Sequence, residues 1–564
     1  MAAMKTVLWS LALLALAATA VATAAATPTA TPLPSPKGET REAVTLPDDA
    51  ALEAAGARVG TITIHTAQIF DMNDPHENYG LYRLTNRLHA HTHAGAVKAA
   101  LLFRSGEPYQ GRLLKETERN LRQLNFLREP RVRPVAWHDG LVDILVETHD
   151  VWTLQINPSY ARSGGTNAAS LAIKDNNLFG YGKTLLAGHS RDVDRSSTYF
   201  EWHDPSVLRG RWIDALRWAN NSDGHDRGLQ IYRPFYALDV RRAGGLTVAD
   251  TLGTDTRYQL GNVYDHYQHA LRLFDVYVGW SPGLRSGHTL RLTAGWHSER
   301  DTFSPMFTGD PPVSSALAPI PANRDLVYPY LQLDWLTDLF DTNHNRDLIG
   351  RTEDVHFGLT ATLQLGVAAP AFGADRNAVI ANGHAGYGWQ LSDRQQLFAD
   401  AGVVGRLEQD CLVDLRSGAD AAWYWRTSRR TLTYIRIAGD TGQALDLDHY
   451  FLLGGDNGLR GYPLRYQQGS SRTLSTIEER LYTDWTIWRL FDVGGAVFFD
   501  AGRTFGANPV HTPQLGWLRD LGIGLRLGNN RSSLGNVIHI DVAAPLDGEN
   551  IRRLQLLVSA AATF

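Results

Sequence analysis

The sequence predicts a mainly β protein, in which a transmembrane antiparallel β-barrel of about 16 strands follows one small α/β domain. Three observations lead to this expectation. Residues 151–564 consist of short alternating segments broken by Gly, Asn, Asp and Pro. Residues 58–150 mix strand-like and helical patterns instead. Residues 1–26 have the pattern of an export signal.

The composition excludes several other classes of protein. The 564 residues are 43% hydrophobic and 20% charged, with 52 glycines, which is not the composition of a disordered chain. Beyond residue 30 there is no uncharged apolar run of about 18 residues, so a bundle of membrane helices is not expected. Cys411 is the only cysteine, so an exported chain of this kind has no internal disulfide. A closed, hydrogen-bonded barrel is one other source of stability.

The N-terminus predicts export. Lys5 forms a short positive region, residues 7–18 form an apolar core, and small-residue A-x-A patterns continue to Ala26. We expect residues 1–26 to be a signal peptide that the mature protein lacks. A membrane anchor is the alternative, but the apolar stretch gives way to Ala and Thr before it reaches a spanning length. Residues 27–57, which begin rich in Thr, Pro and Ala, are expected to be a flexible linker.

Residues 58–150 predict a β-α-α-β-β domain. The segment VGTITIH (residues 59–65) has strand character. A helix is predicted over about residues 111–126, where leucines recur at helical spacing and charges occupy the opposite face. Two further strands follow, joined by the turn His138-Asp139-Gly140, a sequence that accepts positive φ.

Residues 151–564 predict the barrel. About 26 residues for each strand with its turns and longer outer loops give about 16 strands. The first strand is expected at about residues 152–161 and the last at about 552–564, and their pairing would close the barrel. In the last strand one apolar face is formed by Leu554, Leu556, Val558, Ala560, Ala562 and Phe564.

The stretch LGGDNGLRGYPLRY (residues 453–466) places Arg460 among glycines and aromatic residues. A guanidinium withdrawn from bulk water inside a barrel needs carboxylate partners. We expect Gly458 and Gly461 to allow close approach, and Tyr462 to pack beside the arginine. The alternative is an exposed turn whose arginine contacts only water.

Two downstream strands offer acids to this loop. In VGGAVFFDAG, period-two alternation gives one face made of Gly494, Ala496, Phe498, Asp500 and Gly502. In STIEERLYTDW the polar face comprises Glu478, Arg480, Tyr482 and Asp484. We therefore predict that Arg460 pairs with Asp500 and Glu478. Glu479 replaces Glu478 if the register differs by one residue.

These segments resemble a known family. GGDNGLRGYP (454–463), VGGAVFFDAGRTF (493–505), DNNLFGYGKTL (175–185) and the closing strand, behind one β-α-α-β-β domain, are similar to the BamA/TamA-like outer-membrane assembly and translocation superfamily. The resemblance spans about residues 58–564. Its most specific part is the Arg-Gly-Tyr loop with a downstream Phe-x-Asp-x-Gly strand. It implies that residues 58–150 are a POTRA (polypeptide-transport-associated) module, that residues 151–564 are a bacterial surface antigen barrel, and that the loop folds back into the lumen.

The resemblance also implies a function. Such a protein lies in the outer membrane of a Gram-negative bacterium, with its N-terminal domain in the periplasm. It inserts or translocates client proteins, by pairing client strands at the barrel seam. Its partners are the lipid bilayer, unfolded or exported clients, and periplasmic accessory proteins.

Nucleic acid is not expected, because the net charge is −5 and no basic stripe occurs. No enzyme activity, metal or cofactor is expected. Secretion of one dedicated client and a passive channel remain the alternatives.

Two features depart from the family pattern. Val558 and Phe564 fit a C-terminal closure and assembly signal, but Ala562 stands where the family usually has an aromatic residue. The sequence before residue 151 has room for one POTRA-like module, fewer than the central assembly factor usually has. This favours an accessory or specialised role.

Three other motifs carry less weight. HAHTHAG places His89, His91 and His93 on one face, but we see no ligating carboxylate or cysteine at suitable spacing and favour a polar loop. DTNHNRD (341–347) resembles part of a calcium loop but lacks its Gly, so we expect a solvated barrel loop. NLFGYGKT (177–184) lacks the first Gly of a phosphate loop and is interpreted as a strand turn.

Overall fold

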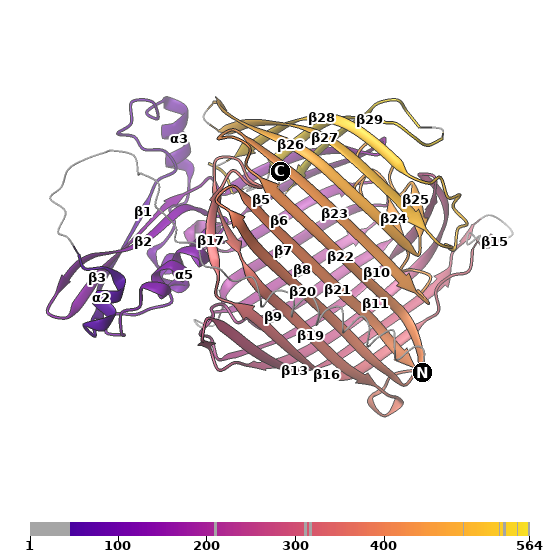
Figure 1. Cartoon of the computed structure of the whole chain (residues 1–564), viewed down its shortest axis with the longest axis horizontal. Helices are drawn as coiled ribbons and strands as arrows, with labels where there is room; N and C mark the ends of the chain where they lie inside the picture. Colours follow the sequence, from indigo (N-terminus) through magenta and orange to yellow (C-terminus); the bar gives the residue numbers. More distant parts are fainter. Residues whose placement is uncertain are drawn as a thin grey trace.

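The computed structural model describes residues 46–207, 211–308, 313–314, 318–488, 490–529, 531–533, 537–549 and 551–561. The predicted signal peptide and Phe564 lie outside these residues. No described helix is long and apolar enough to cross a membrane. The described chain forms a small N-terminal module beside a large barrel (Figure 1).

The N-terminal module is a three-stranded mixed sheet covered by helices. Its strand order is β1-β3-β2, with β1 parallel to β3 and β2 antiparallel to it. Asp139 and Gly140 have φ values of 50° and 74°, which confirms the predicted turn between β2 and β3. The elements in chain order are α2 (Asp49–Ala54), β1 (Arg58–Ala67), α3 (Gly80–Leu88), α4 (Ala94–Ala100), α5 (Gly111–Arg122), β2 (Leu127–His138) and β3 (Leu141–Asp150).

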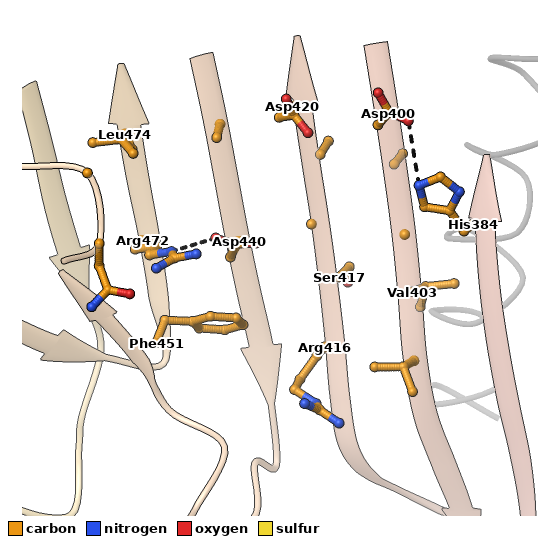
Figure 2. Close-up of a pocket in the computed structure, with 18 of the residues that line it drawn as sticks. His384, Asp400, Val403, Arg416, Ser417, Asp420, Asp440, Phe451, Arg472 and Leu474 are labelled. Carbon is orange, nitrogen blue, oxygen red and sulfur yellow. Dashed lines mark hydrogen bonds and ion pairs between the residues drawn. The ribbon is translucent and has the colours of Figure 1, made fainter. Parts of the chain in front are cut away.

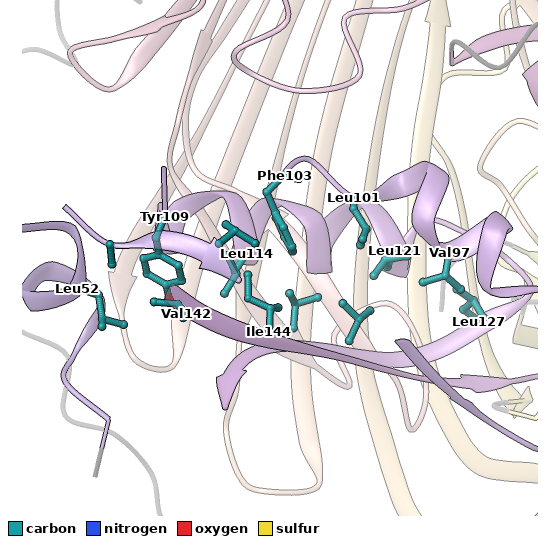
Figure 3. Packing of buried hydrophobic residues seen from close by; sticks show 14 of the residues in the cluster. Leu52, Val97, Leu101, Phe103, Tyr109, Leu114, Leu121, Leu127, Val142 and Ile144 are labelled. Carbon is teal, nitrogen blue, oxygen red and sulfur yellow. The ribbon is translucent and has the colours of Figure 1, made fainter. Parts of the chain in front are cut away.

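One apolar core holds this module together (Figure 3). Val142, Ile144 and Val146 alternate along the inner face of β3, and Leu114 and Leu121 of α5 pack on them. Helix α2 adds Leu52, which is fully buried. The folded module therefore begins before Arg58, inside the stretch that was expected to be a linker.

The remaining strands form a closed barrel of 20 strands in the described chain, which confirms the barrel but corrects the expected number of about 16. It runs from β4 (Leu154–Ser163) to β30 (Gln555–Ala561), and β30 pairs with β4 to close the ring. The intervening strands are β5 (Thr166–Asp175), β6 (Thr184–Arg191), β7 (Ser196–Val207), β8 (Trp212–Asn221), β9 (Gly224–Arg233), β10 (Arg242–Gln259), β11 (Asn262–Trp280), β13 (His288–Pro305), β16 (Arg324–Thr337), β19 (Gly358–Ala368), β20 (Ala378–Ser392), β21 (Gln395–Glu408), β22 (Cys411–Trp425), β23 (Thr431–Gln443), β26 (Ser471–Ile487), β27 (Phe491–Phe505), β28 (Leu518–Asn529) and β29 (Val537–Pro545).

The strand count was too low because long outer loops were assumed. Several connections at the end of the barrel far from the module, the distal end, have only two residues: 164–165, 222–223, 260–261 and 409–410. Tight turns of this length consume little sequence. The longer connections include short elements of their own, namely η1 (Leu178–Gly180), β12 (Leu284–Arg285), β14 (Phe307–Thr308), β15 (Val313–Ser314), β17 (Phe340–His344), β18 (Thr352–His356), η2 (Pro370–Phe372), β24 (Phe451–Leu453) and β25 (Gln467–Gly469).

The outer face of the barrel is apolar. On β28, Leu521, Ile523 and Leu525 are exposed and alternate with residues that face the lumen. Several exposed tryptophans lie toward the end of the barrel that adjoins the module, the module end, namely Trp280, Trp425, Trp485 and Trp488, and Trp517 is exposed near the other end. An apolar band with an aromatic girdle is the surface that membrane-spanning barrels present to lipid.

A polar cluster at Asp150 ties residues 89–92 to the end of β3, and Asn177, between β5 and β6 of the barrel, donates to the Thr92 hydroxyl at 2.7 Å. The carboxylate of Asp150, at the end of β3, accepts hydrogen bonds from the Thr92 hydroxyl (2.5 Å) and backbone N–H (3.1 Å). His89 and His91 lie 3.2 and 2.8 Å from it. Burial alone would raise the pKa of Asp150, but the hydrogen bonds from His89 and Thr92 outweigh burial and hold the pKa below its usual value. A carboxylate therefore does accompany two of the three histidines of HAHTHAG, contrary to our expectation.

We predict that Ile144→Ala destabilises the module by about 2–5 kcal/mol, because it leaves a cavity in a fully packed core. The denaturant midpoint for proteolysis within residues 49–150 of the folded full-length protein measures the effect. Val135→Ala, on the half-exposed side of β2, is the matched control and should change this midpoint little.

Candidate functional site: a loop held in the barrel lumen

The connection between β23 and β26, residues 444–470, folds into the barrel, and we call it the lumen loop. A small ladder of β24 with β25 forms its base. Its apolar side is buried against the barrel wall, in a cluster made of Leu453, Leu459, Tyr462, Tyr466 and Leu518. The loop is thus a packed element and not an exposed turn.

Arg460 carries the polar side of this loop. Its Nε and Nη2 donate to the two oxygens of Asp500 at 2.8 and 3.0 Å, a bidentate pair. Its Nη1 donates to Glu478 Oε2 at 2.7 Å. The ring of Phe498 lies under the guanidinium, 3.3 Å from its carbon to the ring centroid. Asp500 also accepts from the Thr476 hydroxyl at 2.9 Å. The side chains of Arg460, Glu478 and Asp500 are 18%, 4% and 1% exposed.

Strand alternation explains why these acids meet the loop. Glu478 of β26 stands opposite Phe498 of β27, and Thr476 stands opposite Asp500. Residues 494, 496, 498, 500 and 502 are all buried, as the period-two pattern predicted for one face. Glu479 is exposed, so the register favours Glu478 of the two candidates.

Glycines let the loop approach the wall. A Cβ on Gly461 would lie 2.6 Å from Asp520 Cβ, and one on Gly502 would lie 3.1 Å from a methyl group of Leu453. Gly458 has a φ of 103°, a conformation that a side chain disfavours, and a Cβ there would lie 2.2 Å from Leu474. These contacts leave no room for larger residues.

The lumen loop contacts the barrel on both sides of the seam between β30 and β4. The contacts are with the end of β4 on one side, and with β28 and the connection between β29 and β30 on the other. On one side, the Ser163 hydroxyl at the end of β4 donates to the Gly455 carbonyl at 2.8 Å. On the other side, the buried Tyr462 hydroxyl donates to the Arg519 carbonyl at 2.8 Å and lies 3.1 Å from that of Asp547. Val558 stands opposite Arg162 across the seam itself.

Sequence reasoning missed two arginines near this site. Arg480 Nε donates to the second oxygen of Glu478 at 3.0 Å. Arg526, fully buried on β28, has its Nη2 3.7 Å from Glu478 and forms an ion pair with Asp541. The signal for Arg480 was present, because alternation placed it on the same face as Glu478. Arg526 lies on the lumen-facing side of β28 together with Gly524 and Gly528, so the same alternation could have placed it.

Part of the lumen beside the loop remains open. A cavity of about 630 Å³ lies between the loop and the wall formed by β20 to β23 and β26 (Figure 2). Its wall carries charges of both signs, including the ion pair of Arg472 with Asp440 (2.6 Å). Polar walls of this kind hold water.

One group of described residues has the spacing of a metal site. The ligand atoms of Asp414, Asp446 and His449 lie within 4.8 Å of one another. Arg406 already pairs with Asp446 at 2.9 Å and lies 3.8 Å from Asp414. This guanidinium supplies the positive charge that a cation would bring.

We predict that Gly461→Ala destabilises the folded protein by about 1–3 kcal/mol, because the new methyl group overlaps Asp520 and the backbone at Pro545. The temperature at which heat-modifiable gel migration is lost measures this. Gly228→Ala is the control, since the nearest atom to a Cβ there is 3.9 Å away. Equal transition temperatures for the two variants would contradict the tight approach of the loop.

No model of a known protein family matches the chain, and no curated protein sequence does. Solved structures do resemble it. BamA from Haemophilus ducreyi lacking POTRA domains 1–3 is 12% identical, with a TM-score of 0.37 over 89% of this chain and 85% of that one. CdiB from Acinetobacter baumannii is 12% identical, with a TM-score of 0.44 over 89% and 73%. CdiB from Escherichia coli is 12% identical, with a TM-score of 0.45 over 90% and 76%. At these identities and TM-scores the likeness is one of architecture alone.

Proposed function

We propose that this protein acts in the outer membrane of a Gram-negative bacterium, where it inserts or translocates client proteins by pairing their strands with an edge of the barrel seam. The module then lies in the periplasm, and the lumen loop enters from the cell surface. One observation carries this proposal: the lumen loop is anchored by Arg460 and contacts both sides of the seam.

The seam is the place where the barrel can open. Its first strand contains Pro158, which has no N–H to donate, and is followed by Gly164-Gly165. If β4 and β30 separate, their N–H and C=O groups lose their partners, and this is costly in lipid. A client strand that pairs with the open edge satisfies them, and the same edge can pass the client into the bilayer. No covalent chemistry or cofactor takes part.

Secretion of one dedicated client is the second candidate. The open cavity of about 630 Å³ beside the loop favours it, because part of the lumen is already unfilled. A passive channel would leave both the module and the Arg460 anchor without a role. Single-channel recording separates these classes, since a large, steady, solute-selective pore is the signature of a channel.

Arg460→Ala tests the anchor. It leaves Asp500 and Glu478 buried without this partner, which costs about 3–5 kcal/mol for a buried pair, and it frees the loop. We expect a several-fold loss of client proteins from the outer membrane when this variant replaces the native protein in depleted cells. Quantitative outer-membrane proteomics measures the loss. Arg272→Ala, whose side chain is 73% exposed, is the control. Full client levels with unchanged gel migration would contradict the anchor.

Cysteines across the seam test the opening. In a Cys411→Ser background, Arg162→Cys with Val558→Cys places a pair at registered positions of β4 and β30. Oxidation should stop client assembly, and reduction should restore it. The control pair, Ala385→Cys with Ala401→Cys, joins β20 to β21 away from the seam and should leave assembly intact. Unimpaired assembly by the oxidised seam pair rules out a lateral opening.

A further inference from the structure

A second segment enters the lumen, from the module end. The connection between β16 and β19 contains the antiparallel pair β17 and β18, and we call residues 340–356 the inner hairpin. Its tip, residues 345–351, includes the end of the DTNHNRD motif. Figure 1 places β17 beside the module, at the near edge of the barrel. We expected residues 341–347 to be a solvated loop; Asp341, Thr342 and His344 are exposed, but residues 345–347 are half-buried.

Ile349 of the tip is buried against the wall of the lumen, and the other tip residues are half-buried. Ile349 is 3% exposed and packs in a cluster with Tyr424 and Tyr482. Two glycines of the wall make room for it. A Cβ on Gly528 would lie 2.7 Å from Ile349 Cβ, and one on Gly494 would lie 3.1 Å from its Cδ1. The wall is thus shaped for this side chain.

The tip also has a defined shape of its own. The carboxylate of Glu353 accepts the backbone N–H groups of Arg346, Asp347 and Leu348 at 2.9, 3.0 and 3.1 Å. The Asn345 side chain accepts the N–H of Gly350 at 2.7 Å. Backbone groups that would otherwise need water are therefore satisfied inside the hairpin.

One carboxylate connects this tip to the lumen loop. Arg480 Nη1 donates to Asp347 at 3.0 Å and to the Arg346 carbonyl at 2.8 Å. Its Nε donates to Glu478 Oε1, while Arg460 of the lumen loop binds Glu478 Oε2. The two segments thus enter from opposite ends of the barrel and are linked through Arg480 and Glu478 of β26.

The other end of the inner hairpin is bound to the module. Arg122 of α5 makes a bidentate pair with Asp354 of β18, with distances of 2.6 and 2.9 Å. Arg119, one helical turn earlier, stacks on the ring of Phe340 at 3.7 Å. An ion pair and a cation–π contact thus connect α5 to the inner hairpin.

We propose that the inner hairpin is a second, movable plug of the lumen, and that movement of the module away from the barrel withdraws it. Asp347 and Ile349 hold its tip, and Arg122 and Asp354 couple it to the module. Withdrawal removes the Asp347 partner of Arg480 and thereby alters the charges around Glu478, which also holds the lumen loop. This proposal can be tested separately from the proposed function, because the plug would block the passage of ions even when no client is present.

The test is the ion conductance of the purified full-length protein in planar lipid bilayers, without any client. Asp347→Asn removes the charge that Arg480 binds and keeps the shape of the tip. In a second variant Asn-Gly replaces residues 345–351, a turn that suits the adjoining pair His344 and Thr352. Both variants should open several-fold more often than the native protein. Asp341→Asn, exposed on the same hairpin, is the matched control and should behave as native.

Arg122→Gln tests the coupling to the module. It should also raise the open probability of the barrel. In the variant that already lacks the tip, Arg122→Gln should raise this probability little further, since both changes act through the inner hairpin. Native conductance of the tip-replaced variant, with heat-modifiable migration retained, would overturn the plug. An effect of Asp347→Asn without any effect of Arg122→Gln would overturn the coupling. Neither result bears on the seam, which the client assays address separately.

Discussion

The carboxylate of Glu478 is the point on which the interior of this barrel depends. Each of its oxygens accepts a hydrogen bond from a different guanidinium, one from the lumen loop and one from the wall beside the inner hairpin. A buried acid shared in this way is stable only while both partners are present. The arrangement therefore makes the positions of two inserted segments interdependent, although they are far apart in the sequence.

Much of the lumen-loop geometry could be predicted from the sequence. Period-two alternation fixed which side chains of β26 and β27 face inward, and a buried arginine needs acids. The family resemblance implied that the loop enters the lumen, and these two rules then indicated Asp500 and Glu478 as partners of Arg460. The turn at Asp139 followed from its own residues in the same way. The choice of acids needed only the period of a strand, and the turn needed only the φ preference of its residues.

Other features depended on distant contacts that no local pattern reveals. The strand number was wrong because turn lengths at the distal end cannot be deduced from alternation. The tip of the inner hairpin has a polar sequence that is typical of a solvated loop, yet Glu353 and Arg480 satisfy its polar groups. Arg480 lies 133 residues from Asp347. Asp150 likewise lies about 60 residues from His89 and His91 in the sequence, so their shared carboxylate was also missed.

The ring of 20 strands has a further consequence for what passes through it. Lumen width grows with strand number, so one inserted segment leaves space unfilled. The wall of that space alternates acidic and basic side chains, such as Asp420 with Arg436 (3.2 Å). A transverse field of mixed sign favours neither anions nor cations, so any leak through the resting barrel would show weak ion selectivity.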